Sequence, residues 1–158
     1  HTRLRTVTGV QTCALPILEW IRWCWWRRAE TGPEHLRRGR LGEAAARRRL
    51  QELGLRFLAA NFRCRRGEID LVFRDGDCLV FVEVKTRSRE DWTRPAAAVN
   101  AAKRRRLSVT ALEYLRRVGH PRVRIRFDVV EVLLQDGAVR EVRHLRAVFP
   151  LSAPLRYS

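Results

Sequence analysis

The segment from Gly67 to Lys85 most strongly constrains what this chain can fold into. It contains two runs rich in Val, Leu and Phe, separated by the dipeptide Gly76-Asp77. Such a dipeptide between two runs of this composition favours a two-residue hairpin turn, whose twist matches that of the flanking strands. We therefore predict two antiparallel strands in which Asp75 pairs with Cys78.

This register places charged side chains opposite one another further along the hairpin. Counting back from the turn sets Asp70 against Glu83 and Glu68 against Lys85. Opposed side chains of an antiparallel pair have Cβ atoms about 5 Å apart, where two like charges are destabilising. The run before Glu83 is apolar on both faces, so we expect the two acids to be shielded from solvent. A Mg²⁺ ion, which prefers carboxylate oxygens and water, would remove the repulsion.

Lys85 joins the two acids because side chains two residues apart in a strand share a face. We therefore predict that Asp70, Glu83 and Lys85 converge on one face as a metal-dependent site. The alternative is that these are ordinary hairpin charges, with Glu68 and Lys85 as a cross-strand ion pair and Asp70 at a solvated edge. The in-register acids and the basic chain around them favour the metal site.

The charge balance indicates what the chain binds. The net charge is +16 over 158 residues, which predicts a polyanionic partner, with nucleic acid as the first candidate and an anionic membrane surface as the second. The alternative is an arginine-rich proteome in which surplus arginine only decorates the surface. Hydrophobic residues at 46% and charged residues at 32% indicate one folded globular domain.

We divide the chain into an extraneous or disordered tail (residues 1–37), an α/β domain (38–150) and a C-terminal tail (151–158). Residues 1–17 are not typical of the start of a gene product, since the sequence contains no methionine, and residues 7–17 resemble translated sequencing adapter. The aromatic and basic cluster in residues 20–28 is either a membrane-surface or stacking segment or, as we favour, part of that doubtful tail. We find no membrane span or secretory leader and expect a cytoplasmic protein without a membrane partner.

The cysteines show no spacing typical of a zinc site. Cys13, Cys24, Cys64 and Cys78 form no C-x-x-C pair and have no histidine at a suitable distance in the sequence. We therefore predict reduced thiols.

Two amphipathic helices are predicted on either side of the hairpin. The first runs from Arg38 to about Gly54, and the second from the capping residue Asn100 to about Val118, closed by Gly119. Their apolar stripes are Leu41, Ala45, Ala46, Leu50 and Leu53 in the first, and Leu107, Ala111, Leu115 and Val118 in the second.

Glu43 lies on or beside the apolar stripe of the first helix. It is either a further acid of the site or a surface residue that caps the first turn or pairs with Arg47. The sequence favours neither alternative.

Further strands are predicted from Leu55 to Ala60, from Arg126 to Leu134 and, after the turn Asp136-Gly137, from Ala138 to Val142. Residues 61–67 are expected to form a basic connection. Together with the hairpin and the helices, these strands predict an α/β domain with a mixed central sheet flanked by helices.

Two basic segments are candidates for contact with phosphate. Thr86-Arg87-Ser88-Arg89 offers hydroxyl and guanidinium groups, although a solvated loop is an equal alternative. Lys103, Arg104, Arg105 and Arg106 fall in the first turns of the second helix, where basic residues oppose the helix dipole. Helix stability does not explain this block, which therefore predicts a surface that contacts anions.

From about Arg38 to Phe149 the chain resembles the UPF0102 (YraN) family of endonuclease-like proteins with a restriction-endonuclease-like fold. The residues that carry the resemblance are Gly42-Glu43-Ala44-Ala45, Asn61-Phe62-Arg63, Gly67-Glu68-Ile69-Asp70-Leu71, Phe81-Val82-Glu83-Val84-Lys85-Thr86-Arg87, Lys103 and Arg126-Phe127-Asp128-Val129-Val130. The resemblance implies a PD-(D/E)xK site with Asp70 and Glu83 as its acids, Lys85 as its lysine and Glu43 as a helix-borne acid. Ile69 replaces the proline of the nominal motif, a mild departure because the chemistry rests on the acid.

We therefore expect an endonuclease that depends on Mg²⁺ or Mn²⁺ and acts on DNA, with branched or junction DNA as one candidate substrate. Asp70, Glu83 and the Val84 carbonyl would hold the metal, and Lys85 would orient water and stabilise developing charge. Arg87, Lys103 and Arg104 to Arg106 would contact phosphates. The main rival is a non-catalytic nucleic-acid-binding module with the same basic surface, and a third hypothesis is a scaffold or membrane-surface protein. A homodimer is compatible with all three.

Overall fold

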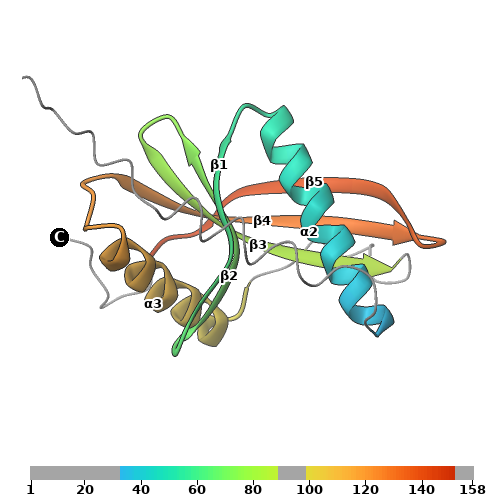
Figure 1. Cartoon of the computed structure of the whole chain (residues 1–158), viewed down its shortest axis with the longest axis horizontal. Coiled ribbons are helices and arrows are strands. Elements are labelled where there is room, and N and C mark those ends of the chain that lie inside the picture. The colour runs from blue at the N-terminus through green and yellow to red at the C-terminus, as the bar shows by residue number, and fades with distance from the viewer. Residues whose placement is uncertain (1–32, 89–98, 152–158) are drawn as a thin grey trace, which may run out of the picture. The chain divides into compact units, whose positions relative to one another are not determined.

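The computed structural model describes residues 33–88 and 99–151. Within them the elements are α2 (Glu34–Glu52), β1 (Arg56–Cys64), β2 (Gly67–Asp75), β3 (Cys78–Ser88), α3 (Ala101–Arg117), β4 (Arg124–Gln135) and β5 (Ala138–Phe149) (Figure 1). The strands form one mixed sheet in the order β1-β2-β3-β4-β5, parallel between β3 and β4 and antiparallel elsewhere. The predicted α/β fold is confirmed. The predicted adapter-like segment and the aromatic cluster lie outside the described residues, as do residues 152–158.

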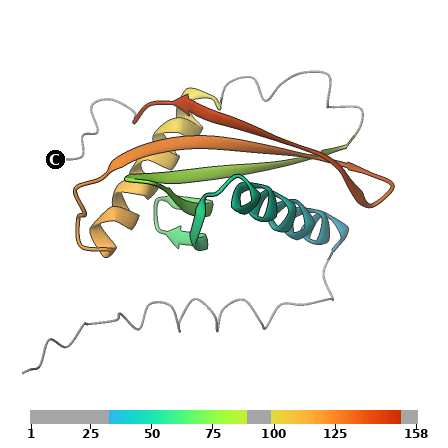
Figure 2. The same cartoon turned by 90° about the horizontal axis from the view of Figure 1, so that it is seen from above.

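The two helices cover opposite faces of this sheet. Leu50 of α2 packs in one core cluster with Val80 and Val82 of β3. Phe81, which lies between those valines, instead contacts Tyr114 of α3, with ring centroids 5.7 Å apart. Because neighbouring side chains of a strand point to opposite faces, this alternation places the helices in different layers. Figure 2 shows α2 along one side of β3.

Hydrophobic stripes were predicted correctly in the middle of each helix and incorrectly at the ends. The buried members are Ala46 and Leu50 of α2 and Leu107, Ala111 and Leu115 of α3, whereas Leu41, Leu53 and Val118 are 38 to 46% exposed. Neither helix within the described residues is long and apolar enough to cross a membrane.

The β2–β3 hairpin forms as predicted near its turn, where Asp75 pairs with Cys78. The pairing continues to Leu71 and Val82 and then ends. The turn dipeptide therefore sets the register correctly, but only over the part of the hairpin in which the two strands stay together.

The predicted facing pairs, Asp70 with Glu83 and Glu68 with Lys85, do not form. Glu68 lies instead opposite Arg63 of β1, with Arg63 Nε 3.2 Å from Glu68 Oε2. The prediction was wrong because it assumed two regular strands along their whole length. Beyond the last paired rung, β2 leaves β3 and continues beside β1, and Figure 1 shows both strands curving away from β3 and β4 towards α3.

β1 changes faces at Asn61. Ala60 packs against the core beneath α2, whereas the ring of Phe62 lies 5.1 Å, between centroids, from that of Tyr114 on α3. Residues two apart in a regular strand share a face, so the backbone between these two must be irregular. Asn61 supplies the irregularity, because its φ of 51° lies in the left-handed region. The change of face directs the far ends of β1 and β2 towards α3.

Gly67 lets β2 lie directly against α3. A Cβ atom at this position would be 2.9 Å from Arg106 Cγ and 3.0 Å from Thr110 Oγ1. Contacts this short would force the helix or the strand to move. The glycine at the start of β2 is therefore required by the close approach of these two elements.

A buried carboxylate, that of Asp128, fastens β4 to β5. It accepts hydrogen bonds from Arg126 Nε and from the backbone N–H of Ala147, both at 2.9 Å, and lies 2.8 Å from His144 Nε2. Burial raises the pKa of Asp128, but the hydrogen bonds from His144, Arg126 and Ala147 together hold it below its ordinary value. Asp128, one of the residues that carry the family resemblance, thus has a structural role in holding β4 and β5 together.

Several element boundaries differ from the predicted ones. α2 begins at Glu34 rather than Arg38, and β3 continues through Ser88, so the expected loop after Lys85 is strand. β1 extends through Cys64, which leaves only a two-residue turn of the predicted basic connection.

The extensions of β1 and β5 share a physical cause. The edge strands β1 and β5 have exposed and partly buried positions along most of their length. Arginine on the solvent-facing side of a strand conceals it from a prediction based on apolar runs. For the same reason β5 ends at Phe149 rather than at the predicted Val142.

Gly42→Ala should destabilise the protein. Gly42 is buried on α2, and a Cβ atom there would collide with Oγ1 of Thr86 on β3. We expect a loss of about 1 to 3 kcal/mol in the free energy of unfolding, the usual range for overpacking. Gly39→Ala on the same helix is the control: nothing lies within 4 Å of its Cβ position, so it should add about 0.5 to 1 kcal/mol. Equal effects of the two variants in denaturant unfolding would contradict the close packing of α2 on β3.

Candidate active site

The point where β2 leaves β3 brings together three of the predicted site residues. Asp70 lies on β2 just beyond the last paired rung, and its Oδ2 accepts a hydrogen bond of 2.7 Å from the backbone N–H of Val84. Glu83 and Lys85 flank Val84 on β3, share a strand face and line one hollow. The structure thus brings Asp70 to the Val84 backbone, between Glu83 and Lys85 in the sequence of β3, and it does so without cross-strand pairing of the two acids.

The backbone of Val84 is directed towards Asp70. Its N–H donates to the Asp70 carboxylate, and the N–H and C=O of one residue in a strand point to the same edge. The paired part of the β2–β3 ladder has already ended at Val82. The Val84 carbonyl is thus directed to the same side as the first acid and is available to bind a cation there.

The carboxyl group of Asp70 lies where a negative charge is unfavourable. Burial raises its pKa to about 7, and the Glu83 and Glu43 carboxylates act in the same direction. The hydrogen bond from Val84 and the charge of Lys103 lower the pKa of Asp70, but they offset only part of the increase. Near neutral pH the proton and the charge are therefore closely balanced at this residue.

Lys103 of α3 pairs with the second acid of the site. Its Nζ lies 3.0 Å from Glu83 Oε1, and the Glu83 side chain is only 12% exposed. The helix cap fixes the position of this lysine, because Asn100 Oδ1 accepts a 2.9 Å hydrogen bond from its backbone N–H, as the predicted cap requires. The sequence predicted a lysine that contacts phosphate, whereas the structure places its ammonium on a carboxylate.

A hollow lies beside the start of α3. Its lining residues come from β3, from α3 and from the residues that precede α3, and they are Glu83, Lys85, Val99, Asn100, Ala102, Lys103 and Arg106. Two lysines and one arginine thus surround a space that also contains one of the acids. A negatively charged group could bind here next to Glu83.

Glu43 contacts a strand residue rather than its own helix. Its Oε2 accepts a 2.9 Å hydrogen bond from Asn61 Nδ2. α2 begins at Glu34, so Glu43 is not in the first turn, and the capping alternative was wrong. The guanidinium carbon of Arg47, the other expected partner, lies 3.7 Å from the centroid of the Phe57 ring.

Burial raises the pKa of Glu43, and the hydrogen bond from Asn61 counteracts part of that increase. Among the described residues, no group of three or more His, Cys, Asp or Glu side chains is arranged to hold a metal ion. Glu43 is therefore near enough to raise the pKa of Asp70 without completing a three-carboxylate cluster. A metal here would depend on Asp70, Glu83 and backbone oxygen.

Glu131 is a buried acid to which the sequence analysis gave no role. It lies in register with Lys85 across the parallel β3–β4 pair, is 1% exposed, and its Oε1 is 3.6 Å from Arg87 Nε. A charged residue inside the otherwise apolar run of residues 129–134 was the available signal. Arg87, for which contact with phosphate and a solvated loop were equal alternatives, lies on β3 beside this buried carboxylate, so the loop alternative was wrong for this residue.

The basic residues of α3 divide into an inner and an outer set. Arg104 Nε donates to the Val99 carbonyl, and its guanidinium carbon is 5.9 Å from the centroid of the Phe149 ring. Arg105 and Arg106 are exposed. Arg105 and Arg106 therefore remain better placed than Arg104 for the predicted contact with phosphate.

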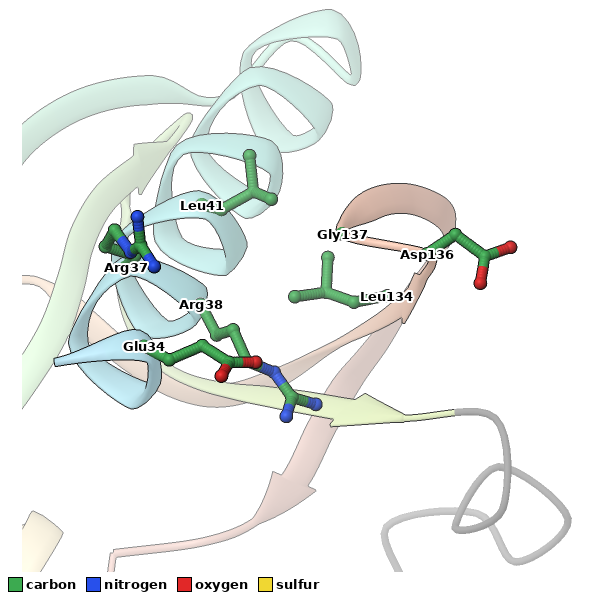
Figure 3. A pocket seen from close by; sticks show the side chains of 7 residues that line it. All are labelled: Glu34, Arg37, Arg38, Leu41, Leu134, Asp136 and Gly137. Atoms are coloured by element: carbon green, nitrogen blue, oxygen red, sulfur yellow. The ribbon is translucent and has the colours of Figure 1, made fainter.

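A second hollow lies between the first turns of α2 and the β4–β5 turn. Figure 3 shows Leu41 and Leu134 in this space, with the carboxylate of Asp136 pointing away from the helix. The other lining residues are Glu34, Arg37, Arg38 and Gly137. None of the predicted site residues is among them, and apolar, acidic and basic groups are mixed without a common target. The chemistry therefore favours the hollow beside Glu83.

The fold and this site define an α/β protein in which two acids and a lysine meet where neighbouring strands part. A family model described as "Uncharacterised protein family UPF0102" matches residues 42–132. A UPF0102 protein of Rhodococcus jostii (strain RHA1) is 43% identical over 111 residues, covering 70% of this chain and 94% of that protein. Another, from Parafrankia sp. (strain EAN1pec), is 47% identical over 114 residues, covering 72% and 96%. The chain belongs to the UPF0102 family.

Asp70→Asn should stabilise the protein at high pH. The pKa of about 7 in the folded protein lies above the ordinary value of 3.8, so the folded state binds this proton more tightly than the unfolded state. Stability therefore falls as the pH rises from about 4 to about 7. The variant should gain on the order of 2 kcal/mol in unfolding free energy at about pH 8 and almost nothing at about pH 4. Denaturant unfolding at both pH values measures the difference.

Asp77→Asn is the matched control for that experiment. Asp77 is exposed, and Arg124 Nη2 lies 2.6 Å from its Oδ1. The hydrogen bond from Arg124 lowers the pKa of Asp77, so this substitution should slightly lower stability at high pH. A destabilised Asp70→Asn variant at about pH 8 would show that burial does not dominate at Asp70.

Proposed function

We propose that this protein is a metal-dependent nuclease that hydrolyses phosphodiester bonds of DNA. The observation that carries the proposal is the half-buried meeting of Asp70, Glu83 and Lys85 beside the Val84 backbone. A buried carboxylate whose pKa a neighbouring acid raises, as Glu83 raises that of Asp70, costs stability, so the juxtaposition needs a compensating role. Binding a divalent cation next to a lysine is such a role.

The groups at the site fit a hard divalent cation. Mg²⁺ and Mn²⁺ favour carboxylate and carbonyl oxygens together with water and substrate phosphate. Asp70, Glu83 and the Val84 carbonyl would hold the ion, and the absence of thiol or imidazole ligands among these groups argues against a softer metal. When bound, the ion polarises the scissile phosphate and lowers the pKa of a neighbouring water.

Lys85 lies on the same strand face as Glu83 and lines the same hollow. Its ammonium group can orient the attacking water and stabilise the negative charge that develops on the phosphate oxygens. Lys103 neutralises Glu83 at 3.0 Å when no cation is bound. In the proposed reaction this ammonium leaves the carboxylate and contacts the phosphate that enters the hollow.

A second candidate function is a nucleic-acid-binding module without catalysis. The Lys103–Glu83 ion pair favours it, because an internal ammonium already neutralises one acid. The net charge of +16 supports binding of a polyanion equally well in both cases. Cleavage that requires a divalent metal distinguishes the two.

Lys85→Ala should reduce metal-dependent cleavage by roughly two orders of magnitude, because one positioned charge donor contributes about 3 kcal/mol in the transition state. The experiment incubates the full chain with linear DNA, branched DNA and RNA in Mg²⁺, Mn²⁺ or chelator. Calorimetry should show that the variant retains its metal affinity. Wild-type rates from Lys85→Ala would remove Lys85 from the mechanism.

The acids provide the complementary test. Mg²⁺ at millimolar concentration should raise the melting temperature of the wild type and of Lys85→Ala by mass action, but not that of Asp70→Asn or Glu83→Gln. DNA binding without cleavage in any metal, together with melting temperatures that do not respond to Mg²⁺, would favour the binding module.

Replacing Arg105 and Arg106 with Gln should weaken DNA binding and reduce the slope of log affinity against log salt by roughly two, since each lost phosphate contact removes about 0.9. Arg116 and Arg117 on the last turn of α3 provide the matched control, because both pair with Glu113. Their replacement with Gln removes the same charge and should leave the slope nearly unchanged. Equal slopes for the two double variants would place the binding surface elsewhere.

A further inference from the structure

We propose that Asn61 is a positioning residue that fixes the carboxylate of Glu43 at the edge of the active site. The inference rests on the proposed function and extends it to a residue without acid or base chemistry of its own. Its basis is the 2.9 Å hydrogen bond from Asn61 Nδ2 to Glu43 Oε2, which joins β1 to α2.

The backbone of Asn61 adopts the conformation that this contact needs. Its φ of 51° lies in the left-handed region although it falls inside the strand Arg56–Cys64. That conformation is unfavourable for a residue with a side chain, and Asn tolerates it better than most. Ala60 faces the core under α2, and regular alternation would turn the next side chain away from that helix. The left-handed residue instead directs its amide to the helix that carries Glu43.

The position of Asn61 in the sheet links it to the first acid as well. Ala60 pairs with Leu71 and Phe62 pairs with Ile69, so Asn61 and Asp70 occupy the rung between these two pairs. One residue therefore lies across from the strand-borne acid and binds the helix-borne acid.

The hydrogen bond restricts a side chain that would otherwise be mobile. A glutamate on a helix has several accessible rotamers, and fixing one of them costs conformational entropy. The Asn61–Glu43 contact is near solvent, where a hydrogen bond adds little to net stability. Its main effect is therefore on direction: it holds one oxygen of Glu43 at the β1 residue that lies across from Asp70. Groups that orient a metal site in this way typically affect metal affinity or activity by about 10- to 100-fold.

The competing explanation is that the contact only attaches β1 to α2. Asn61→Gly isolates the side-chain contact from the backbone conformation, because glycine adopts the left-handed conformation readily and the substitution removes only the amide. Glu43→Gln keeps the size of its side chain and removes the charge. If Asn61 acts through Glu43, the double variant should be no worse than the worse single variant, whereas independent effects should multiply.

The experiment measures cleavage of DNA and Mn²⁺ affinity by calorimetry for the full-length wild type, both single variants and the double variant. Asn61→Gly should lower kcat and Mn²⁺ affinity by about 10-fold or more, with KM for DNA changed less than threefold. Asp136→Gly is the control. Asp136 has the same φ of 51° but lies in the β4–β5 turn, so its replacement should leave both quantities unchanged.

Wild-type kcat and Mn²⁺ affinity in Asn61→Gly, or losses that multiply in the double variant, would overturn the role of Asn61. A wild type that binds Mn²⁺ but cleaves no DNA would reject the nuclease and leave the positioning role supported if Asn61→Gly binds Mn²⁺ more weakly. A wild type that neither binds Mn²⁺ nor cleaves DNA would overturn both proposals. The two failures are therefore distinguishable.

Discussion

The structure depends on the parting of β2 from β3 after the rung formed by Leu71 and Val82. Beyond it the Val84 N–H donates to the carboxylate of Asp70 instead of taking part in the hairpin ladder. A buried backbone donor needs a partner, and here a side chain provides it. Because the Asp70 carboxylate, rather than a backbone carbonyl of β2, accepts this hydrogen bond, β2 can turn away with β1 while β3 continues beside β4. The backbone of β3 is then accessible near Asp70 and Glu83.

Charge at this point is balanced from several elements. β2 and β3 provide the acids, α3 provides Lys103, and α2 provides Glu43 through its contact with Asn61. Asp70 is largely buried, the charges of Glu83 and Glu43 raise its pKa further, and the ammonium of Lys103 offsets this increase only in part. Small displacements of either helix would change this balance, which is why the close packing of Gly42 on β3 and of Gly67 on α3 matters for the site.

The hairpin turn, the two helices and the shared strand face of Glu83 and Lys85 could be predicted because each follows from local pattern: turn dipeptides, apolar stripes and side-chain alternation. The position of Asp70 at the Val84 backbone did not follow from the predicted register. The departure of β2 from β3 could not, because alternation assumes a regular strand and no residue type marks where a ladder stops. Asn61 was assigned to a connection since its neighbours are basic, and its left-handed backbone is visible only in the folded chain. The pairing of Lys103 with Glu83 depends on how α3 docks, which sequence spacing does not specify.

The one parallel pair of the sheet has a consequence for how the chain folds. β1, β2 and β3 are joined by short turns, whereas β3 and β4 are separated in sequence by α3 and the segments around it. Contacts between distant segments form late, because closing a long loop costs entropy before the contacts compensate for it. We therefore expect the β1–β2–β3 meander, which carries Asp70 and Glu83, to assemble first. The pairing of β3 with β4, and the docking of α3 that brings Lys103 to Glu83, would then form in a later and slower step.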